Sequence, residues 1–142
     1  MWTTKLYRYG RNLTAESKST LSAQEKVDLC VNSLREKKAI DVVVLDVRPM
    51  SSFADFFIIC SGASHRQVQA LAEHVEAVMR QHGLRPLGVE GAQEARWILL
   101  DCNDVIIHIF YQPWREFYDL EGLWLEAPRQ SAPESIVQGA ES

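Results

Sequence analysis

Residues 56–61 read Phe-Phe-Ile-Ile-Cys-Ser, and Gly62-Ala63-Ser64 lead from this run into a segment with a different hydrophobic period. A short run of aromatic and β-branched residues, bounded by Ser and Gly, predicts a strand buried on both faces. After Ser64 the apolar residues recur at helical spacing, which predicts an amphipathic helix that Gly83 ends with a left-handed cap. The apolar face of this helix holds Val68, Leu71, Ala72, Val75, Val78 and Met79. A buried strand that leads into such a helix indicates an α/β fold.

The segment before this strand predicts one helix and one further strand. Ser22 and Glu25 have the spacing of a capping box, in which each side chain satisfies one orphan amide at a helix start. Apolar residues follow at the spacing of one helical face, so we expect a helix from there to about Lys38. Asp41–Val47 (DVVVLDV) has the composition of a second buried strand, and residues 48–55 form the turn between the two strands.

The segment after Gly83 predicts three strands and a last helix. Residues 84–89 have the composition of a short strand, and residues 88–91 that of a turn. The runs 97–101 and 105–110 predict a hairpin joined by Cys102-Asn103-Asp104. Pro113 suits the first turn of a short helix over residues 114–124. The predicted fold class is α/β, with a mixed sheet of about five strands flanked by helices.

The chain of 142 residues, of which 46% are hydrophobic, has the size and composition of a single domain. We expect this domain at 22–126, between a flexible N-terminal extension at 1–21 and a disordered, polar, proline-containing tail at 127–142. Basic residues among Ser and Thr in the extension could mark an organelle transit peptide or only a variable leader. We expect a location in a bacterial cytoplasm, with an organelle as the alternative.

The formal charge of -4 is unevenly distributed, at +4 over residues 1–39, -7 over 40–126 and -1 over 127–142. Attraction to phosphate supplies much of the affinity for nucleic acids, so binding to DNA or RNA is disfavoured. An acidic domain favours a neutral or basic partner, such as a ribosomal protein. The longest apolar runs fall far short of the roughly 20 residues that span a bilayer, which disfavours a membrane segment.

Residues that could carry catalysis form no recognisable motif. The turn Ser61-Gly62-Ala63-Ser64 could hold a phosphate, but it lacks the Lys of a P-loop, and no D-x-D pair of metal-binding carboxylates follows it. The histidines have no metal-ligand spacing, and we expect His108 to be a hydrogen-bonded histidine within the sheet. Cys30, Cys60 and Cys102 are odd in number and far apart, which favours a reducing compartment. We therefore expect no metal, no cofactor and no catalysis.

Residues 90–124 combine acidic and aromatic side chains, a composition that suits a contact surface. Aromatic residues anchor interfaces, and carboxylates complement a basic partner. Taken singly, however, Trp97, Phe117 and Trp124 are each favoured as core residues that close a small sheet. The aromatic residues of the segment are Trp97, Phe110, Tyr111, Trp114, Phe117, Tyr118 and Trp124.

Several segments, read in order, resemble the iojap or ribosome silencing factor family. They begin with D-x-x-x-L-D-V at 41–47 and A-D-F-F-I-I-C-S-G-A-S-H-R-Q-V at 54–68. They continue with E-G at 90–91, R-W-I-L-L-D at 96–101, V-I-I-H-I-F at 105–110, R-E-F-Y-D-L-E at 115–121 and L-W at 123–124. The resemblance covers about residues 23–126. This sequence has Phe56 where the family often has Tyr, and Gly122 where it usually has Arg.

The resemblance implies a fold similar to that of nucleotidyltransferases, without their catalysis or a cofactor. It implies binding to the large ribosomal subunit through protein uL14, which obstructs joining of the small subunit and silences translation when nutrients are short. A homodimer of the free protein is a further implication. The implied partner-binding residues are Glu90, Trp97, Asp101, His108, Tyr118, Asp119 and Glu121. Two alternatives stay open: a nucleotidyltransferase-like enzyme or nucleotide-binding protein, and a module that binds a small molecule or peptide.

Overall fold

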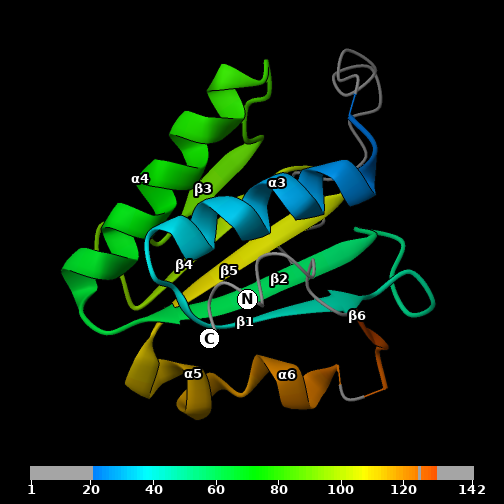
Figure 1. Cartoon of the computed structure of the whole chain (residues 1–142). Coiled ribbons are helices and arrows are strands. Elements are labelled where there is room, and N and C mark those ends of the chain that lie inside the picture. Colours follow the sequence, from blue (N-terminus) through cyan, green and yellow to red (C-terminus); the bar gives the residue numbers. More distant parts are fainter. Residues whose placement is uncertain (1–20, 125, 131–142) are drawn as a thin grey trace, which may run out of the picture.

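The structure, a computed structural model, describes residues 21–124 and 126–130, which form a six-stranded sheet with helices on both faces (Figure 1). The strand order is β3-β4-β5-β2-β1-β6; β2 and β5 are parallel, and the other neighbouring strands are antiparallel. The predicted mixed sheet is confirmed, with six strands instead of about five. The strands are β1 (Ile40–Asp46), β2 (Phe56–Gly62), β3 (Gly88–Glu90), β4 (Trp97–Asp101), β5 (Val105–Tyr111) and β6 (Arg129–Gln130). The helices are α3 (Ala23–Glu36), α4 (His65–Gln81), α5 (Gln112–Tyr118) and α6 (Leu120–Leu123).

Helix α3 begins with the predicted capping box. The Ser22 hydroxyl accepts a hydrogen bond from the Glu25 amide at 3.1 Å, and the Glu25 carboxylate accepts one from the Ser22 amide at 2.9 Å. The helix ends slightly before the predicted end, because Lys38 has a left-handed backbone with φ of 62°. The Ala39 amide then donates to the Leu34 carbonyl at 3.0 Å and closes the last turn.

The stretch from β2 into α4 folds as predicted. Every residue of β2 is buried, and the Ser64 hydroxyl caps α4 by accepting a hydrogen bond from the Gln67 amide at 3.0 Å. Gly83 follows the helix with φ of 75°, the left-handed conformation expected of it. Gly62 allows β2 and α4 to approach closely, because a Cβ at this position would lie 2.9 Å from Cγ2 of Val68.

The predicted hairpin of β4 and β5 is confirmed. Its strands are antiparallel, and its turn passes through Asn103, which has φ of 73°. Asn tolerates this left-handed conformation better than most residues. The parallel register of β5 with β2 places Ile58 beside Ile107 at the centre of the sheet.

Three features of the C-terminal half correct the sequence-based predictions. Strand β3 occupies 88–90, so the turn predicted to begin at Gly88 instead follows Glu90, at Gly91 with φ of 80°. The predicted last helix is two helices, because Asp119 has a left-handed backbone with φ of 46°. Strand β6 pairs with β1 within the segment predicted to be a disordered tail. The predictions for residues 1–20 and 131–142 lie outside the described residues.

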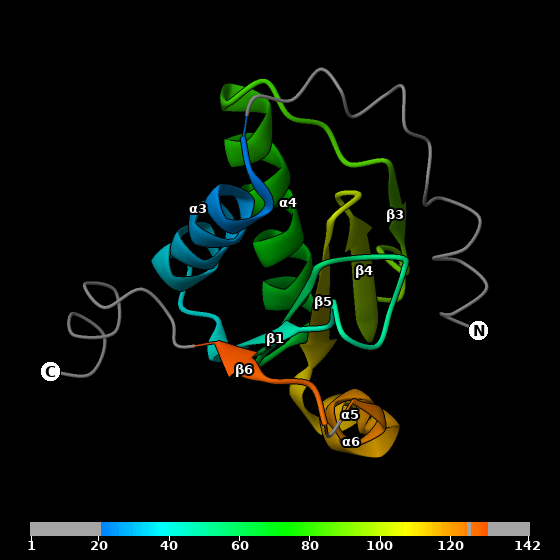
Figure 2. The ribbon, with the colours of Figure 1, turned by 90° about the vertical axis from the view of Figure 1, so that its right-hand side faces the viewer.

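The two faces of the sheet carry separate apolar layers, and Figure 2 shows helices on either side of the sheet. Helices α3 and α4 cover the first face, on which Ile107 and Ile109 of β5 are buried. The intervening residues Ile106, His108 and Phe110 face the second layer, because side chains alternate along a strand. Helices α5 and α6 lie on this second side (Figures 1 and 2). Within residues 21–124 and 126–130, no helix has the length and apolar character that a membrane crossing requires.

Candidate partner-binding surface

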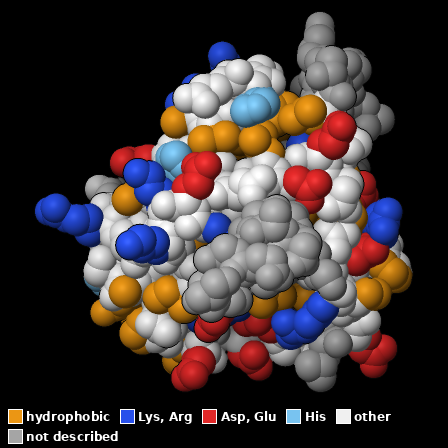
Figure 3. Space-filling view, in the orientation of Figure 1, with side chains coloured by type: hydrophobic (Ala, Val, Ile, Leu, Met, Phe, Trp, Pro, Cys, Tyr) orange, Lys and Arg blue, Asp and Glu red, His pale blue; other side chains and the backbone are white. Residues whose placement is uncertain are grey.

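Helices α5 and α6 expose two large apolar side chains. Phe117 is 72% exposed and Leu123 is 68% exposed, and the nearby Tyr118 is exposed as well. Monomeric proteins normally bury such side chains, and grouped exposed ones mark interaction sites. We call the exposed side chains of Phe117, Tyr118, Asp119 and Leu123 the α5–α6 surface. Figure 3 shows hydrophobic and acidic side chains together along the lower edge of the molecule, where α5 and α6 lie.

The aromatic residues of this surface continue into the interior as a chain of ring contacts. Tyr118 packs on Trp97 with 4.8 Å between ring centroids, and Trp97 stacks on buried Phe110 at 5.1 Å. The Trp114 and Phe117 rings pack with 5.1 Å between their centroids, and the Arg96 guanidinium stacks on Trp114 at 4.9 Å from its ring centroid. Aromatic side chains that are fixed by packing against other rings lose little conformational entropy on binding, so this arrangement suits an interface anchor.

Asp119 shapes the break between the two helices. Its carboxylate accepts a hydrogen bond from the Gly122 amide at 3.2 Å and thereby caps α6. A Cβ at Gly122 would lie 2.2 Å from Asp119 Oδ2, so any larger residue there requires the Asp119 side chain to move away. The departure at Gly122 therefore accompanies a cap that an Arg at this position would displace.

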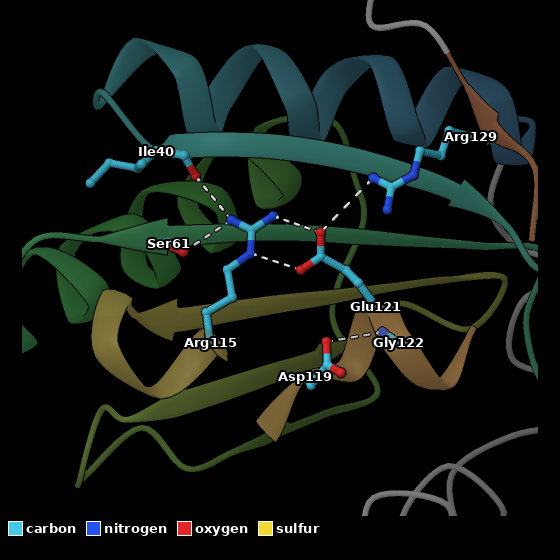
Figure 4. A network of polar contacts seen from close by, with 7 residues as sticks. All are labelled: Ile40, Ser61, Arg115, Asp119, Glu121, Gly122 and Arg129. Carbon is cyan, nitrogen blue, oxygen red and sulfur yellow. Dashed lines mark hydrogen bonds and ion pairs between the residues drawn. The ribbon is translucent and has the colours of Figure 1, made fainter. Parts of the chain in front are cut away.

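A network of ionic and hydrogen-bonding contacts joins these helices to the sheet (Figure 4). The Arg115 guanidinium donates to both carboxylate oxygens of Glu121, with Nε to Oε1 at 3.0 Å and Nη2 to Oε2 at 3.1 Å. Its Nη1 donates to the Ser61 hydroxyl at 3.0 Å and to the Ile40 carbonyl at 3.4 Å. The hydrogen bonds from Arg115 lower the pKa of Glu121, so this carboxylate is ionised at neutral pH.

Two predicted partner-binding residues are buried. Asp101 is 1% exposed, and its Oδ1 accepts a hydrogen bond from the Asn103 amide at 2.9 Å. His108 is fully buried within the second layer, where Trp97 Nε1 donates to its Nδ1 at 3.1 Å. Burial lowers the pKa of His108 to about 3, so the ring is neutral. The prediction of a hydrogen-bonded sheet histidine is confirmed. Asp101 and His108 are both buried within the domain, and whether either contacts a partner stays a prediction.

The structure brings four of the other predicted residues together and leaves one at the sheet edge. Trp97, Tyr118, Asp119 and Glu121 lie on or next to α5 and α6. Glu90 lies in the edge strand β3 opposite Leu99, on the same face of the sheet as Trp97. Whether these five residues contact a partner stays a prediction.

Sequence reasoning undervalued three residues of this region. The sequence favours a core position for Phe117, and it does not distinguish Leu123 and Arg115 from their neighbours. Trp114, Phe117 and Tyr118 have the i, i+3, i+4 spacing of one helical face, which favours a buried face, so no local signal in the sequence indicates that α5 buries none of its residues.

The turn that could hold a phosphate is occupied by groups of the protein. The Ser61 hydroxyl accepts a hydrogen bond from Arg115, and the Ala63 amide donates to Gln67 Oε1 at 2.7 Å. The Ser64 hydroxyl already caps α4. Within residues 21–124 and 126–130, no group of three or more His, Cys, Asp and Glu is placed to hold a metal ion. Burial raises the pKa of the Cys30 and Cys60 thiols to about 12, which keeps both protonated.

Fold and surface together define a small α/β domain that exposes aromatic, apolar and acidic side chains on its two C-terminal helices. Comparison with known families identifies the group. The family described as "Ribosomal silencing factor during starvation" matches residues 20–142, and the chain belongs to this family. Family membership supports a ribosome-associated silencing role.

Named relatives and solved structures agree with this assignment. The chain is 44% identical to a ribosomal silencing factor of Halalkalibacterium halodurans, over 76% of this chain and 92% of the relative. It is 42% identical to that of Bacillus subtilis, over 66% and 79% respectively. A crystal structure from Bacillus halodurans matches with a TM-score of 0.69 and 41% identity, covering 76% of this chain and 98% of that one. One from Chromobacterium violaceum has a TM-score of 0.73 and 32% identity, over 79% and 92%.

Proposed function

We propose that this protein binds the large ribosomal subunit through ribosomal protein uL14 and, by occupying that site, blocks joining of the small subunit and represses translation. The observation that carries the proposal is the α5–α6 surface. Phe117 and Leu123 expose most of their apolar area to water, and burying such area against a partner is favourable. Family membership supports a partner that belongs to the ribosome.

The charge around the surface supports a basic partner. Asp119 and Glu116 are exposed beside Phe117, and residues 40–126 carry a formal charge of -7. Carboxylates at the rim of an apolar contact speed association with a basic protein and disfavour the ribosomal RNA backbone. A basic ribosomal protein fits this combination better than RNA does.

Steric exclusion requires no reaction, and we propose that the protein is not an enzyme. The turn at residues 61–64 supports this view, because its hydroxyls and one amide are already bonded within the protein. We place the protein in the bacterial cytoplasm. When free, it can cover Phe117 and Leu123 by forming a homodimer, since the same apolar area would be buried between two copies.

Sedimentation with isolated ribosomal subunits tests the proposal. Purified protein is pelleted through a sucrose cushion with large subunits, with small subunits or with both, and subunit joining is measured by light scattering. We expect the protein to pellet with large subunits alone and to reduce joining. The double variant F117S/L123S should do neither, because it removes the apolar anchors without removing a buried side chain.

The matched control is Val89→Ser, which removes an exposed apolar side chain from β3 on the other face of the sheet. This control should pellet like the wild type. Failure of the wild type to pellet with large subunits would overturn the proposed function. Equal binding by F117S/L123S and the wild type would keep the ribosome as partner but exclude the α5–α6 surface as the contact.

A further inference from the structure

Helices α5 and α6 are held to the sheet by few buried apolar groups. None of the residues of α5 is buried, and α6 buries Leu120 alone. Trp114 is only partly buried against the second layer. A surface element with so little buried area needs another attachment if its side chains are to keep one orientation.

Arg115 supplies that attachment. Its side chain is 12% exposed, and its three guanidinium nitrogens donate to groups from three other elements. These elements are α6 through Glu121, β2 through Ser61 and β1 through Ile40, while Arg115 itself belongs to α5 (Figure 4). A bidentate pair between arginine and a carboxylate has a fixed geometry, and it fixes the relative position of the elements that it joins.

We infer that Arg115 and Glu121 are positioning residues that hold the α5–α6 surface in its binding orientation, and that Glu121 acts through Arg115 instead of touching the partner. This inference rests on the proposed function. It changes the role of Glu121, which the family resemblance had placed among the contact residues.

The contacts that the Glu121 carboxylate already makes within the protein support this assignment. Both of its oxygens accept from Arg115, and Oε2 also lies 3.9 Å from Nη1 of Arg129 in β6. A basic group of a partner would have to displace Arg115, which cannot lose its charge and would remain largely buried without a carboxylate. Asp119 has no such constraint, because it is exposed and its Oδ1 only caps a short helix.

A double-mutant cycle separates positioning from contact. The variants are Arg115→Gln, Glu121→Gln and the double variant, each titrated against isolated large ribosomal subunits. If Glu121 acts through Arg115, E121Q weakens binding by about tenfold in the wild type and has little further effect in the R115Q background. If Glu121 contacts the partner directly, it weakens binding by the same factor in both backgrounds, and the inference is overturned.

Hydrogen exchange tests the positioning without any ribosome. In R115Q the amides of residues 112–124 should exchange faster than in the wild type, while those of the β2 and β5 core strands keep their protection. Arg115→Lys should recover only part of the protection, because an ammonium group cannot reproduce the bidentate pair. Unchanged exchange over residues 112–124 would overturn the inference, and a loss of protection across the whole sheet would replace positioning with a general role in stability.

The control for both measurements is Glu73→Gln, the same chemical change at an exposed position of α4 on the opposite side of the sheet. It should leave binding and exchange unchanged. The outcomes for the two proposals are distinguishable. If the wild type fails to bind large subunits, the proposed function fails, and exchange alone then decides whether the pair positions these helices. If the wild type binds and R115Q binds equally well, only the positioning role fails.

Discussion

Trp97 donates a hydrogen bond from Nε1 to Nδ1 of His108 at 3.1 Å. This bond connects Trp97, which packs under Tyr118 of the α5–α6 surface, to a fully buried histidine. Because an indole nitrogen can only donate, Nδ1 of His108 must accept, and the neutral ring carries its proton on Nε2. The ring of Phe57 packs against the same histidine with 4.8 Å between ring centroids. Trp97 Nε1 and His108 Nδ1 are therefore bonded to each other within the protein and not to a partner.

Stability should fall in mild acid because of His108. Burial lowers its pKa from 6.5 to about 3 in the folded protein. Below pH 6.5 the unfolded chain takes up a proton that the folded protein does not, so the contribution is present above that pH and is lost as pH falls toward 3. Between pH 7 and pH 5 we expect this one group to lower the free energy of unfolding by about 2 kcal/mol.

Urea unfolding of the wild type and of His108→Gln at both pH values measures this contribution. The Gln side chain keeps an acceptor for Trp97 and does not titrate. The variant should start less stable at pH 7 but lose about 2 kcal/mol less on acidification than the wild type. Parallel losses in the two proteins would show that the histidine is protonated without unfolding.

His108 also shows how far the sequence could predict the site. A polar residue inside an apolar run indicated a hydrogen-bonded histidine, because a buried imidazole needs a partner. Its partner Trp97 lies eleven positions away and comes into reach through the hairpin register. The family resemblance implies a partner-binding role for Asp101, and the burial of this side chain cannot be read from the neighbouring sequence. Only the packing of the second layer decides it.

The strongly periodic elements were predictable, and the long-range polar contacts were not. The bounds of β2 and α4 follow from apolar spacing, an N-cap and a glycine, which are all local features. Arg115 instead finds Ser61 and Ile40, which lie 54 and 75 positions away along the chain. Nothing near Arg115 in the sequence encodes these partners, so its role depends on the sheet topology. Strand β6 was missed because its two residues are too few to show an alternation.

Gly62 should be intolerant of a side chain for a packing reason. A Cβ there would lie 2.9 Å from Cγ2 of Val68 and 3.1 Å from its amide nitrogen, in the first turn of α4. Gly62→Ala should therefore push α4 away from β2 and lower the free energy of unfolding by about 1–3 kcal/mol in a denaturant titration. The loss should be the same with and without nucleotide and magnesium. A nucleotide that stabilises the wild type but not this variant would revive the reading of the turn as a phosphate site.

The exposed apolar residues of the α5–α6 surface should govern self-association. Phe117 and Leu123 contribute little to the core at 72% and 68% exposure, so F117S/L123S should unfold within about 0.5 kcal/mol of the wild type. The same variant should remain monomeric at concentrations where light scattering detects a dimer of the wild type. A wild type that is monomeric at every concentration would exclude the homodimer, and a dimer of the variant would locate the dimer contact elsewhere.

Asp119 offers a way to separate charge from structure at the proposed contact. Its left-handed backbone and its cap on the Gly122 amide are both available to Asn, which tolerates this conformation and has a side-chain carbonyl oxygen that can accept the same hydrogen bond. Asp119→Asn should therefore leave the free energy of unfolding within about 0.5 kcal/mol of the wild type. If the carboxylate attracts a basic partner, the variant should bind large subunits several-fold more weakly, and the difference should shrink as salt is raised.

Asp119→Ala provides the comparison, because Ala cannot cap α6 and is strained at positive φ. We expect it to lose about 1–2 kcal/mol of stability in addition to the loss of affinity. Equal binding by the Asn variant and the wild type at low salt would mean that the carboxylate serves only the turn, and the acidic part of the proposed contact would then have to come from Glu116 or from residues outside α5 and α6. Weaker binding by the Asn variant at unchanged stability would instead identify an electrostatic contact at the break between the two helices.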